Sequence, residues 1–180
     1  MDIKTQLQNY TSIFAEEELY KSQILNFLDS AQLPYHRIND VGHFTASGFL
    51  LNSDRTKFLL MHHKKLDQWF QPGGHCDGSS DLLQVAIRET IEESGIAEII
   101  PITLDIYDID VHLIPANAKE KEHYHYDIRF LLKTAGNDTF NQNEESNELR
   151  WIDIKDYANS DVEFNHSIER MVKKYIKLEL

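Results

Sequence analysis

The chain has 180 residues, 41% of them hydrophobic and 11% aromatic, which excludes an intrinsically disordered protein and suits one domain, 1–180, with a sizeable core. Its net charge of −12 disfavours duplex nucleic acid and anionic membranes as partners, but it allows a small phosphorylated substrate where a bound metal reverses the local charge. The only cysteine, Cys76, excludes an intramolecular disulfide and indicates a reducing compartment.

The sequence shows neither a secretory signal nor a segment long and apolar enough to span a membrane. No basic stretch followed by an apolar one occurs near the N-terminus, and no run of about 18 apolar residues occurs anywhere. We therefore expect a cytoplasmic protein that does not bind membranes, either as a monomer or as a homodimer.

Residues 1–35 show helical periodicity that ends at Pro34. The apolar residues recur at roughly helical spacing, with charged residues between them: Phe14, Leu19, Ile24, Leu25, Phe27 and Leu28. We expect an N-terminal helical segment that packs on the rest of the domain. A dimer contact or a lid over the active site stays open as an alternative use of the same segment.

Two strands follow, at 43–52 and 57–62, joined by the turn residues of 52–55 into a hairpin. A glycine loop from Gly73 leads into a helix with Asp81 as its N-cap and Gly95 as its C-cap. The expected buried stripe of this helix is Leu83, Ala86, Ile87, Thr90 and Ile91. Cys76 is interpreted as a small buried apolar residue and not as a nucleophile.

The helix carries three carboxylates that project from one patch. Glu89, Glu92 and Glu93 are three or four residues apart and so share a helix face. Carboxylates at this spacing repel one another unless a cation lies among them, and hard divalent cations prefer oxygen ligands. The stretch therefore predicts a site for Mg²⁺ or Mn²⁺ where the glycine loop meets the helix.

The whole stretch Gly73–Ile96 resembles the Nudix box, whose pattern is G-x5-E-x7-R-E-U-x-E-E-x-G-U with U an aliphatic residue. Seven positions match in register: Gly74, Arg88, Glu89, Glu92, Glu93, Gly95 and Ile96. Two depart, because Ser80 stands where the pattern has its first Glu and Thr90 where it has its first aliphatic residue.

This resemblance implies an α/β fold, a Nudix-like α/β/α sandwich with a mixed β-sheet. It also implies a metal-dependent hydrolase in which water attacks phosphorus and cleaves a diphosphate bond of a nucleoside diphosphate derivative. Glu92 and Glu93 would ligate the metal together with the main-chain carbonyl of Gly73. Glu89 would be a further ligand or the base for water, and Arg88 would orient the glutamates.

Ser80 leaves open which group completes the metal site and how many ions bind. Asp77 and Asp81 are near in sequence and could substitute through a water molecule. Acidic residues outside the box are further candidates: Glu120, Glu122, Glu144 and Glu145.

Residues 99–115 and 123–133 read as strands, and 148–154 as another, followed by a helix over 161–178. On the second of these strands His123, His125, Asp127 and Arg129 alternate onto one face. We expect this face to bind substrate or to form a polar network with Asp108, Asp110 and His112 across the sheet. A dedicated transition-metal site is the alternative, because histidine is a common metal ligand.

Two other functions fit parts of the sequence. A Nudix domain can bind a nucleotide without hydrolysing it, as a sensor or regulator, although the intact glutamates argue against this. An isomerase similar to isopentenyl diphosphate isomerase needs a cysteine outside the box, and Cys76 lies inside it. The choice among adenine-containing diphosphates, nucleoside triphosphates, dinucleoside polyphosphates and diphosphate sugars stays open.

Overall fold

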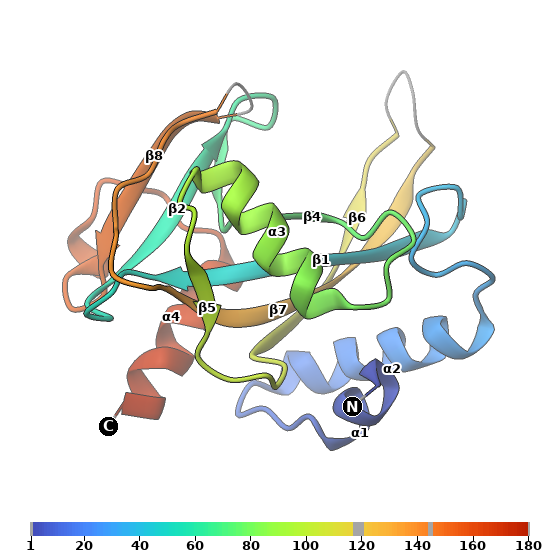
Figure 1. Cartoon of the computed structure of the whole chain (residues 1–180). Coiled ribbons are helices and arrows are strands. Elements are labelled where there is room, and N and C mark those ends of the chain that lie inside the picture. The colour runs from blue at the N-terminus through green and yellow to red at the C-terminus, as the bar shows by residue number, and fades with distance from the viewer. Residues whose placement is uncertain (1, 117–120, 144–145, 180) are drawn as a thin grey trace.

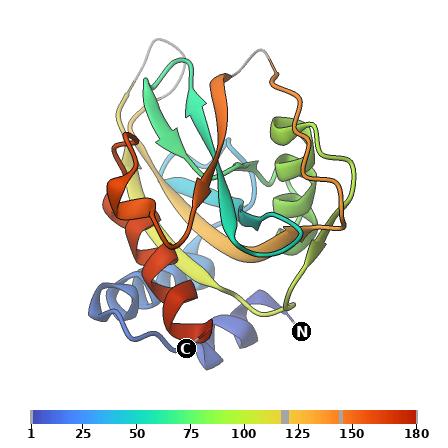
Figure 2. The same ribbon diagram turned by 90° about the vertical axis from the view of Figure 1, so that its left-hand side faces the viewer.

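The computed structural model of the protein describes residues 2–116, 121–143 and 146–179, and Figure 1 shows how their elements are arranged. The helices are α1 (Ile3–Asn9), α2 (Ala15–Ser30), α3 (Leu82–Ser94) and α4 (His166–Glu179), with a short 3₁₀ turn, η1 (Tyr157–Asn159), before α4. In the turned view of Figure 2, α3 and α4 lie on opposite sides of the strands. Within the described residues, no helix is long and apolar enough to cross a membrane.

The strands form one mixed sheet, which confirms the predicted α/β fold with helices on both sides. Their bounds are β1 (Gly42–Leu51), β2 (Lys57–His63), β3 (Gln68–Phe70), β4 (Gly73–His75), β5 (Ile99–Pro101), β6 (Asp108–Ile114), β7 (His123–Thr134) and β8 (Ser146–Asp153). The sheet runs β3-β2-β1-β7-β5, while β4 pairs with β1, β6 with β7 and β8 with β2.

The centre of the sheet is the parallel pair of β1 and β7, which extends from Gly42 opposite Tyr124 to Leu51 opposite Lys133. β6 lies antiparallel along the other edge of β7. Every residue of β1 is buried, as expected for a central strand covered on both faces. The predicted hairpin of β1 and β2 is present, with Leu51 opposite Phe58 next to the turn. On its other edge β2 pairs with β8 along its whole length, from Lys57 to His63.

Three predicted elements differ in extent from the observed ones. The N-terminal segment is helical, but Tyr10–Phe14 separates α1 from α2. The single strand expected over 99–115 is two strands, β5 and β6, because Pro101 ends the first and a turn at Thr103–Asp105 follows. The last helix begins at His166 and not at residue 161, because the Asn165 side chain accepts the backbone N–H of Ile168 (2.9 Å) as a cap.

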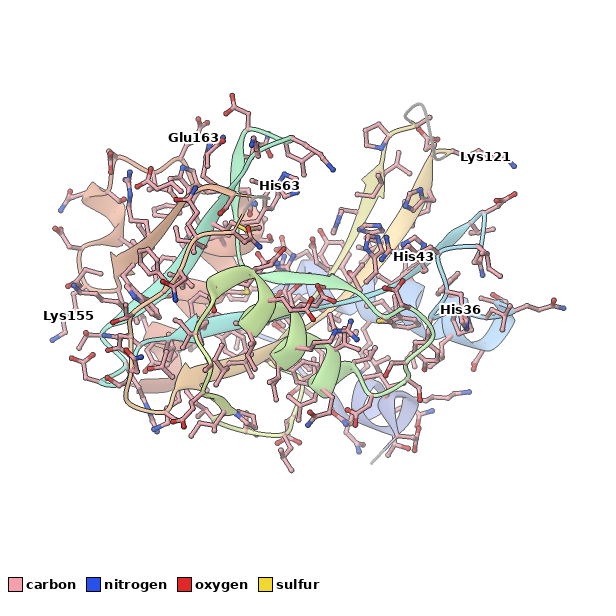
Figure 3. All side chains as sticks on the ribbon, turned by 45° about the horizontal axis from the view of Figure 1, so that its top comes forward. His36, His43, His63, Lys121, Lys155 and Glu163 are labelled. Atoms are coloured by element: carbon pink, nitrogen blue, oxygen red, sulfur yellow. The ribbon has the colours of Figure 1, made fainter. Side chains whose placement is uncertain are left out.

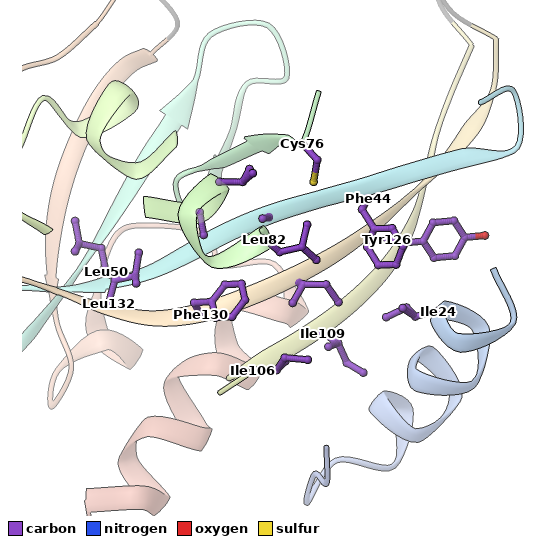
Figure 4. Close-up of a cluster of buried hydrophobic side chains, with 14 of the residues drawn as sticks. Ile24, Phe44, Leu50, Cys76, Leu82, Ile106, Ile109, Tyr126, Phe130 and Leu132 are labelled. Atoms are coloured by element: carbon purple, nitrogen blue, oxygen red, sulfur yellow. The ribbon is translucent and has the colours of Figure 1, made fainter. Parts of the chain in front are cut away.

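Alternate residues of β1 and β7 feed two hydrophobic clusters. One side, with Phe44 and Phe130, packs with side chains of α1, α2 and α3 (Figure 4). The other side, with Phe49 and Leu131, packs with α4 and with β2 and β8. The strand period of two therefore explains how one sheet supports helices on both faces.

A buried ion network ties the helices to the sheet beside these clusters. Asp108 on β6 is fully buried, and its carboxylate accepts hydrogen bonds from Arg129 of β7 (3.2 Å), Arg170 of α4 (2.7 and 3.0 Å) and Lys174 of α4 (2.8 Å). Lys174 also donates to Glu17 of α2, which is fully buried too. One carboxylate thus joins β6, β7 and α4, and through Lys174 it reaches α2.

Replacing Asp108 with Asn should destabilise the fold by about 3 kcal/mol, because removing one partner of a buried ion pair leaves the other charges uncompensated. The pKa of Asp108 lies below its ordinary value of 3.8 because Arg170, Arg129 and Lys174 outweigh the desolvation that opposes them. The stabilisation is therefore complete above about pH 4 and falls as the pH drops further toward the pKa in the folded state. Urea unfolding followed by circular dichroism measures both effects.

Asp105→Asn is the matched control for this prediction, since Asp105 is exposed and contacts only its own turn. It should change the free energy of unfolding by less than about 0.5 kcal/mol. Equal stability of Asp108→Asn and Asp105→Asn at pH 7 would contradict the assigned role of the network.

Candidate active site

The predicted glycine loop begins as a strand. β4 pairs antiparallel with β1, so that Gly73 lies opposite Ser47. A Cβ atom on Gly73 would lie 2.4 Å from Oγ of Ser47, and one on Gly74 would lie 2.3 Å from Oε2 of Glu89. Gly73 is therefore required by its close approach to the backbone of β1, whereas a side chain at Gly74 would displace the carboxylate of Glu89.

α3 is held in register by its caps and by one buried carboxylate. Asp81 accepts the backbone N–H of Gln84 (3.2 Å), and Gly95 closes the helix in the left-handed conformation with φ +69°, as predicted. Glu93 is only 8% exposed, and its Oε2 accepts the backbone N–H of Gly73 (2.9 Å). This bond fixes the last turn of α3 against the strand that begins the box.

Arg88 connects the other two glutamates to the loop. Its Nη2 donates to Oε1 of Glu89 (2.6 Å) and to the backbone carbonyl of His75 (3.1 Å). Its Nε lies 3.9 Å from Oε1 of Glu92, one helical turn further on. Glu92 is exposed and Glu89 is partly buried. The carboxylates therefore range from the interior to the solvent along one edge of the helix.

The donor set fits a hard divalent cation. The side chains are all carboxylates, and the glycines remove the steric barrier between them and the backbone of β4. In the described part of the chain, Arg88 is the cation that contacts Glu89 and Glu92, so the patch keeps a negative balance. The same residues do not bring three carboxylate oxygens within 4.8 Å of one another, so a cation would draw them closer.

Ser80 lies exposed just before α3 and supplies no carboxylate. Asp77 is engaged by Arg37, whose guanidinium lies 2.7 and 2.9 Å from its oxygens and holds the pKa of Asp77 low. Asp81 is used as the helix cap. Glu122 is exposed beside β7, and the other acidic candidates, Glu120, Glu144 and Glu145, lie outside the described residues.

The buried stripe of α3 is shifted from the expected one. Ala86 and Thr90 are fully buried as predicted, and Leu82 and Val85 are buried beside them, while Leu83, Ile87 and Ile91 are only partly buried. The shift comes from the end of the helix, where Glu93 and Ser94 face inward. Thr90 fits beside Gly48, where a Cβ atom would lie 2.5 Å from its hydroxyl.

The predicted polar face of β7 has two parts. Asp127 and Arg129 are each 2% exposed and belong to the interior. Asp127 accepts from Ser47 (2.8 Å) and Arg129 (2.8 Å), while Arg129 also donates to Asp108 and Asp110 across the sheet. Their polar atoms thus serve the cross-strand network, and neither is exposed enough for direct contact with a substrate in this conformation.

The other part of the face is a group of histidines. Together with His123 and His125 it contains His112 on β6 and two residues that the sequence analysis did not single out, His43 on β1 and His75 on β4. His43 alternates with Thr45 and Ser47 on its strand, so its face could have been read from the sequence. The pairing of that face with β7 could not, because it depends on the register of distant strands.

A cavity of about 620 Å³ in the described structure lies away from both groups. Tyr10, Tyr107 and Lys174 are among its lining residues, and no residue of the stretch Gly73–Ile96 lines it. The arrangement of carboxylates and glycines, and not this cavity, therefore identifies the candidate active site.

Known proteins are similar to this chain in sequence. A family model described as the NUDIX domain matches residues 42–174. A probable DHNTP pyrophosphohydrolase of Lactococcus lactis is 30% identical over 136 residues, which cover 73% of this chain and 78% of that protein. An RNA pyrophosphohydrolase of Dinoroseobacter shibae is 25% identical over 154 residues, covering 80% and 92%.

Solved structures share the fold. A NUDIX-family hydrolase from Clostridium perfringens aligns with a TM-score of 0.59 at 23% identity, covering 76% of this chain and 97% of that one. A MutT protein from Methanosarcina mazei aligns with a TM-score of 0.57 at 16% identity, covering 78% and 96%. At these identities the likeness concerns the fold alone.

Cys76 should be inert toward thiol reagents in the folded protein. It is 1% exposed, and burial together with Asp127 raises the pKa of its thiol to about 12, so almost no thiolate exists at pH 8. Incubation with iodoacetamide at pH 8, followed by mass spectrometry, should show no added mass in the native state. The same treatment in guanidinium chloride should modify one site, and rapid labelling of the folded chain would contradict this placement.

Proposed function

The chain belongs to the NUDIX family, and from that premise we propose which bond, which cation and which residues its site uses. It is a Nudix-type pyrophosphohydrolase, which hydrolyses a diphosphate bond. We propose that the bond belongs to a nucleoside diphosphate derivative and that the protein works in the cytoplasm. The observation that best supports a hydrolytic site here is the hydrogen bond from the backbone N–H of Gly73 to Glu93, which holds the acidic end of α3 against the glycine strand.

The metal ion in this proposal is Mg²⁺ or Mn²⁺. Glu89, Glu92, Glu93 and the carbonyl of Gly73 would hold it, since all are oxygen donors at the junction of β4 and α3. When bound, the ion neutralises phosphate oxygens and lowers the pKa of a coordinated water. In the described structure the carboxylate oxygens are not close enough together to surround one ion, so their side chains would move when the ion binds.

The contacts of Glu93, Glu89 and Arg88 suggest a different role for each residue. Glu93 is fixed by the backbone of Gly73 and acts as the anchored ligand. Glu89 directs one oxygen toward Arg88 and lies with the other against Gly74, which makes it the candidate base that accepts the proton of the attacking water. Arg88 orients Glu89 and Glu92 from the carbonyl of His75.

For the predicted substrate-binding face we retain the histidines and reassign the rest. His123 and His125 stay candidates for a ligand at the end of the sheet. Asp127 and Arg129 are proposed to act indirectly, by fixing β1, β6 and β7 relative to one another. A non-catalytic nucleotide sensor is the second candidate function, and no contact in the described structure favours it.

The test is a panel of substrates with Mg²⁺ and with Mn²⁺, analysed by product chromatography. The panel contains nucleoside triphosphates, dinucleoside polyphosphates, diphosphate sugars and DHNTP. At least one should be cleaved at a diphosphate bond, and Glu92→Gln and Glu93→Gln should each lower kcat/KM by about 100-fold or more, because each removes a metal ligand.

Glu98→Gln is the matched control, because Glu98 is exposed just beyond α3 and carries the same side chain. It should leave turnover unchanged. Tight binding of a nucleotide with no turnover of any compound in the panel would favour the sensor. Unchanged turnover in Glu92→Gln and Glu93→Gln would overturn the assignment of the site.

A further inference from the structure

Five histidines meet at one end of the sheet, and we call them the histidine cluster: His43, His75, His112, His123 and His125. Figure 3 labels His43, which lies beside β6 and β7. The register explains the meeting, because His125 of β7 lies opposite His43 of β1 on one side and His112 of β6 on the other. Its ring centroid lies 4.8 Å from that of His43 and 5.4 Å from that of His112.

Three members of the cluster bring their nitrogen atoms together. One ring nitrogen of each of His43, His123 and His125 lies within 4.8 Å of the others. The Nε2 atoms of His123 and His125 are 3.3 Å apart. Two imidazole ligands of a tetrahedral zinc ion, with Zn–N distances of about 2.0–2.1 Å, have their nitrogens about 3.3–3.4 Å apart. The observed spacing therefore matches one edge of a tetrahedral coordination shell.

Oxygen acceptors outside the cluster bind the Nδ1 atoms of His123 and His112, which leaves the Nε2 atoms of these rings to carry the lone pairs. Nδ1 of His123 lies 2.8 Å from the carbonyl oxygen of Lys121, so Nδ1 carries the proton and Nε2 presents its lone pair to His125. Nδ1 of His112 lies 3.2 Å from Oδ2 of Asp110, the carboxylate–histidine pairing that often orients metal ligands. Outer contacts of this kind fix both tautomer and ring angle before any ion binds.

Burial removes part of the cluster from solvent. His43 is 2% exposed and His123 is 7% exposed. Desolvation, assisted by His112, His75, His43 and His123, lowers the pKa of His125 to about 2. Neutral imidazoles are the form that ligates metal, and nitrogen ligands suit zinc, nickel, copper and iron better than magnesium. The cluster thus differs in donor chemistry from the carboxylates of α3.

We propose that His43, His123 and His125 bind a transition-metal cation of the zinc type. The fourth position would be filled by His75, His112 or water, since both rings border His125. Bound there, the cation cross-links the beginnings of β1 and β7. The proposal stands apart from the hydrolysis of diphosphate bonds and does not depend on it. Its alternative is a plain N–H···N hydrogen bond between His123 and His125 without metal.

The test uses the full-length, untagged chain, stripped of metal with a chelator and dialysed. Titration with Co²⁺ should give the visible absorption of a tetrahedral site, saturating at one ion per chain, and one equivalent of Zn²⁺ should remove it. A large excess of Mg²⁺ should leave the spectrum unchanged. Absence of a tetrahedral spectrum, or its loss on adding Mg²⁺, would overturn the proposal in favour of the hydrogen bond.

Substitutions of single histidines test where the Co²⁺ ion binds. His123→Asn and His125→Asn should each weaken Co²⁺ binding by at least tenfold, with circular dichroism showing that the fold is retained. His166→Gln, a change at an exposed histidine of α4, should bind as the parent chain does. Glu92→Gln should lose hydrolysis and keep the spectrum, which separates this proposal from the proposed function. Binding in His123→Asn and His125→Asn equal to that of the parent would overturn the assignment.

Discussion

The carboxylate of Asp108 is fully buried, so the fold must bring positively charged partners to it. Arg129 comes from the neighbouring strand, while Arg170 and Lys174 come from a helix more than sixty residues later in the sequence. Because an unpaired charge in such a place is costly, α4 has little freedom to slide or rotate relative to β6. The placement of β7, and with it the histidines and Asp127, depends on this constraint.

The molecule carries two candidate sets of metal donors, which differ in the type of donor atom. The carboxylates of α3 are hard oxygen donors near solvent, and the glycines of β4 let them approach the backbone. The histidine cluster offers imidazole nitrogens, with those of His43, His123 and His125 close together. His75 belongs to the cluster through its ring, and its carbonyl receives Arg88 of the carboxylate patch. The two sets are therefore joined by a single residue, although their ion preferences are opposite.

The sequence predicted the parts of this molecule that depend on local rules. The caps Asp81 and Gly95, the strand alternation of β7 and the i,i+4 contact of Arg88 with Glu92 all follow from neighbouring residues. The inward turn of Glu93 did not follow, because its partner, the N–H of Gly73, becomes available only when β4 pairs with β1. The burial of Arg129 and the joining of His43 to His125 likewise depend on parallel pairing between strands some eighty residues apart.

The continuous pairing of β1 with β7 also limits which changes of length the gene can tolerate. β7 is held on one edge by β1, over 124–133, and on the other by β6, over 123–129, and by β5, over 132–134. Deleting one codon within it would turn every following side chain to the opposite face, placing Phe130 among charges and Arg129 in the hydrophobic core. Insertions and deletions should therefore be tolerated in the connections between strands, where a change of length leaves the register of β1 and β7 intact.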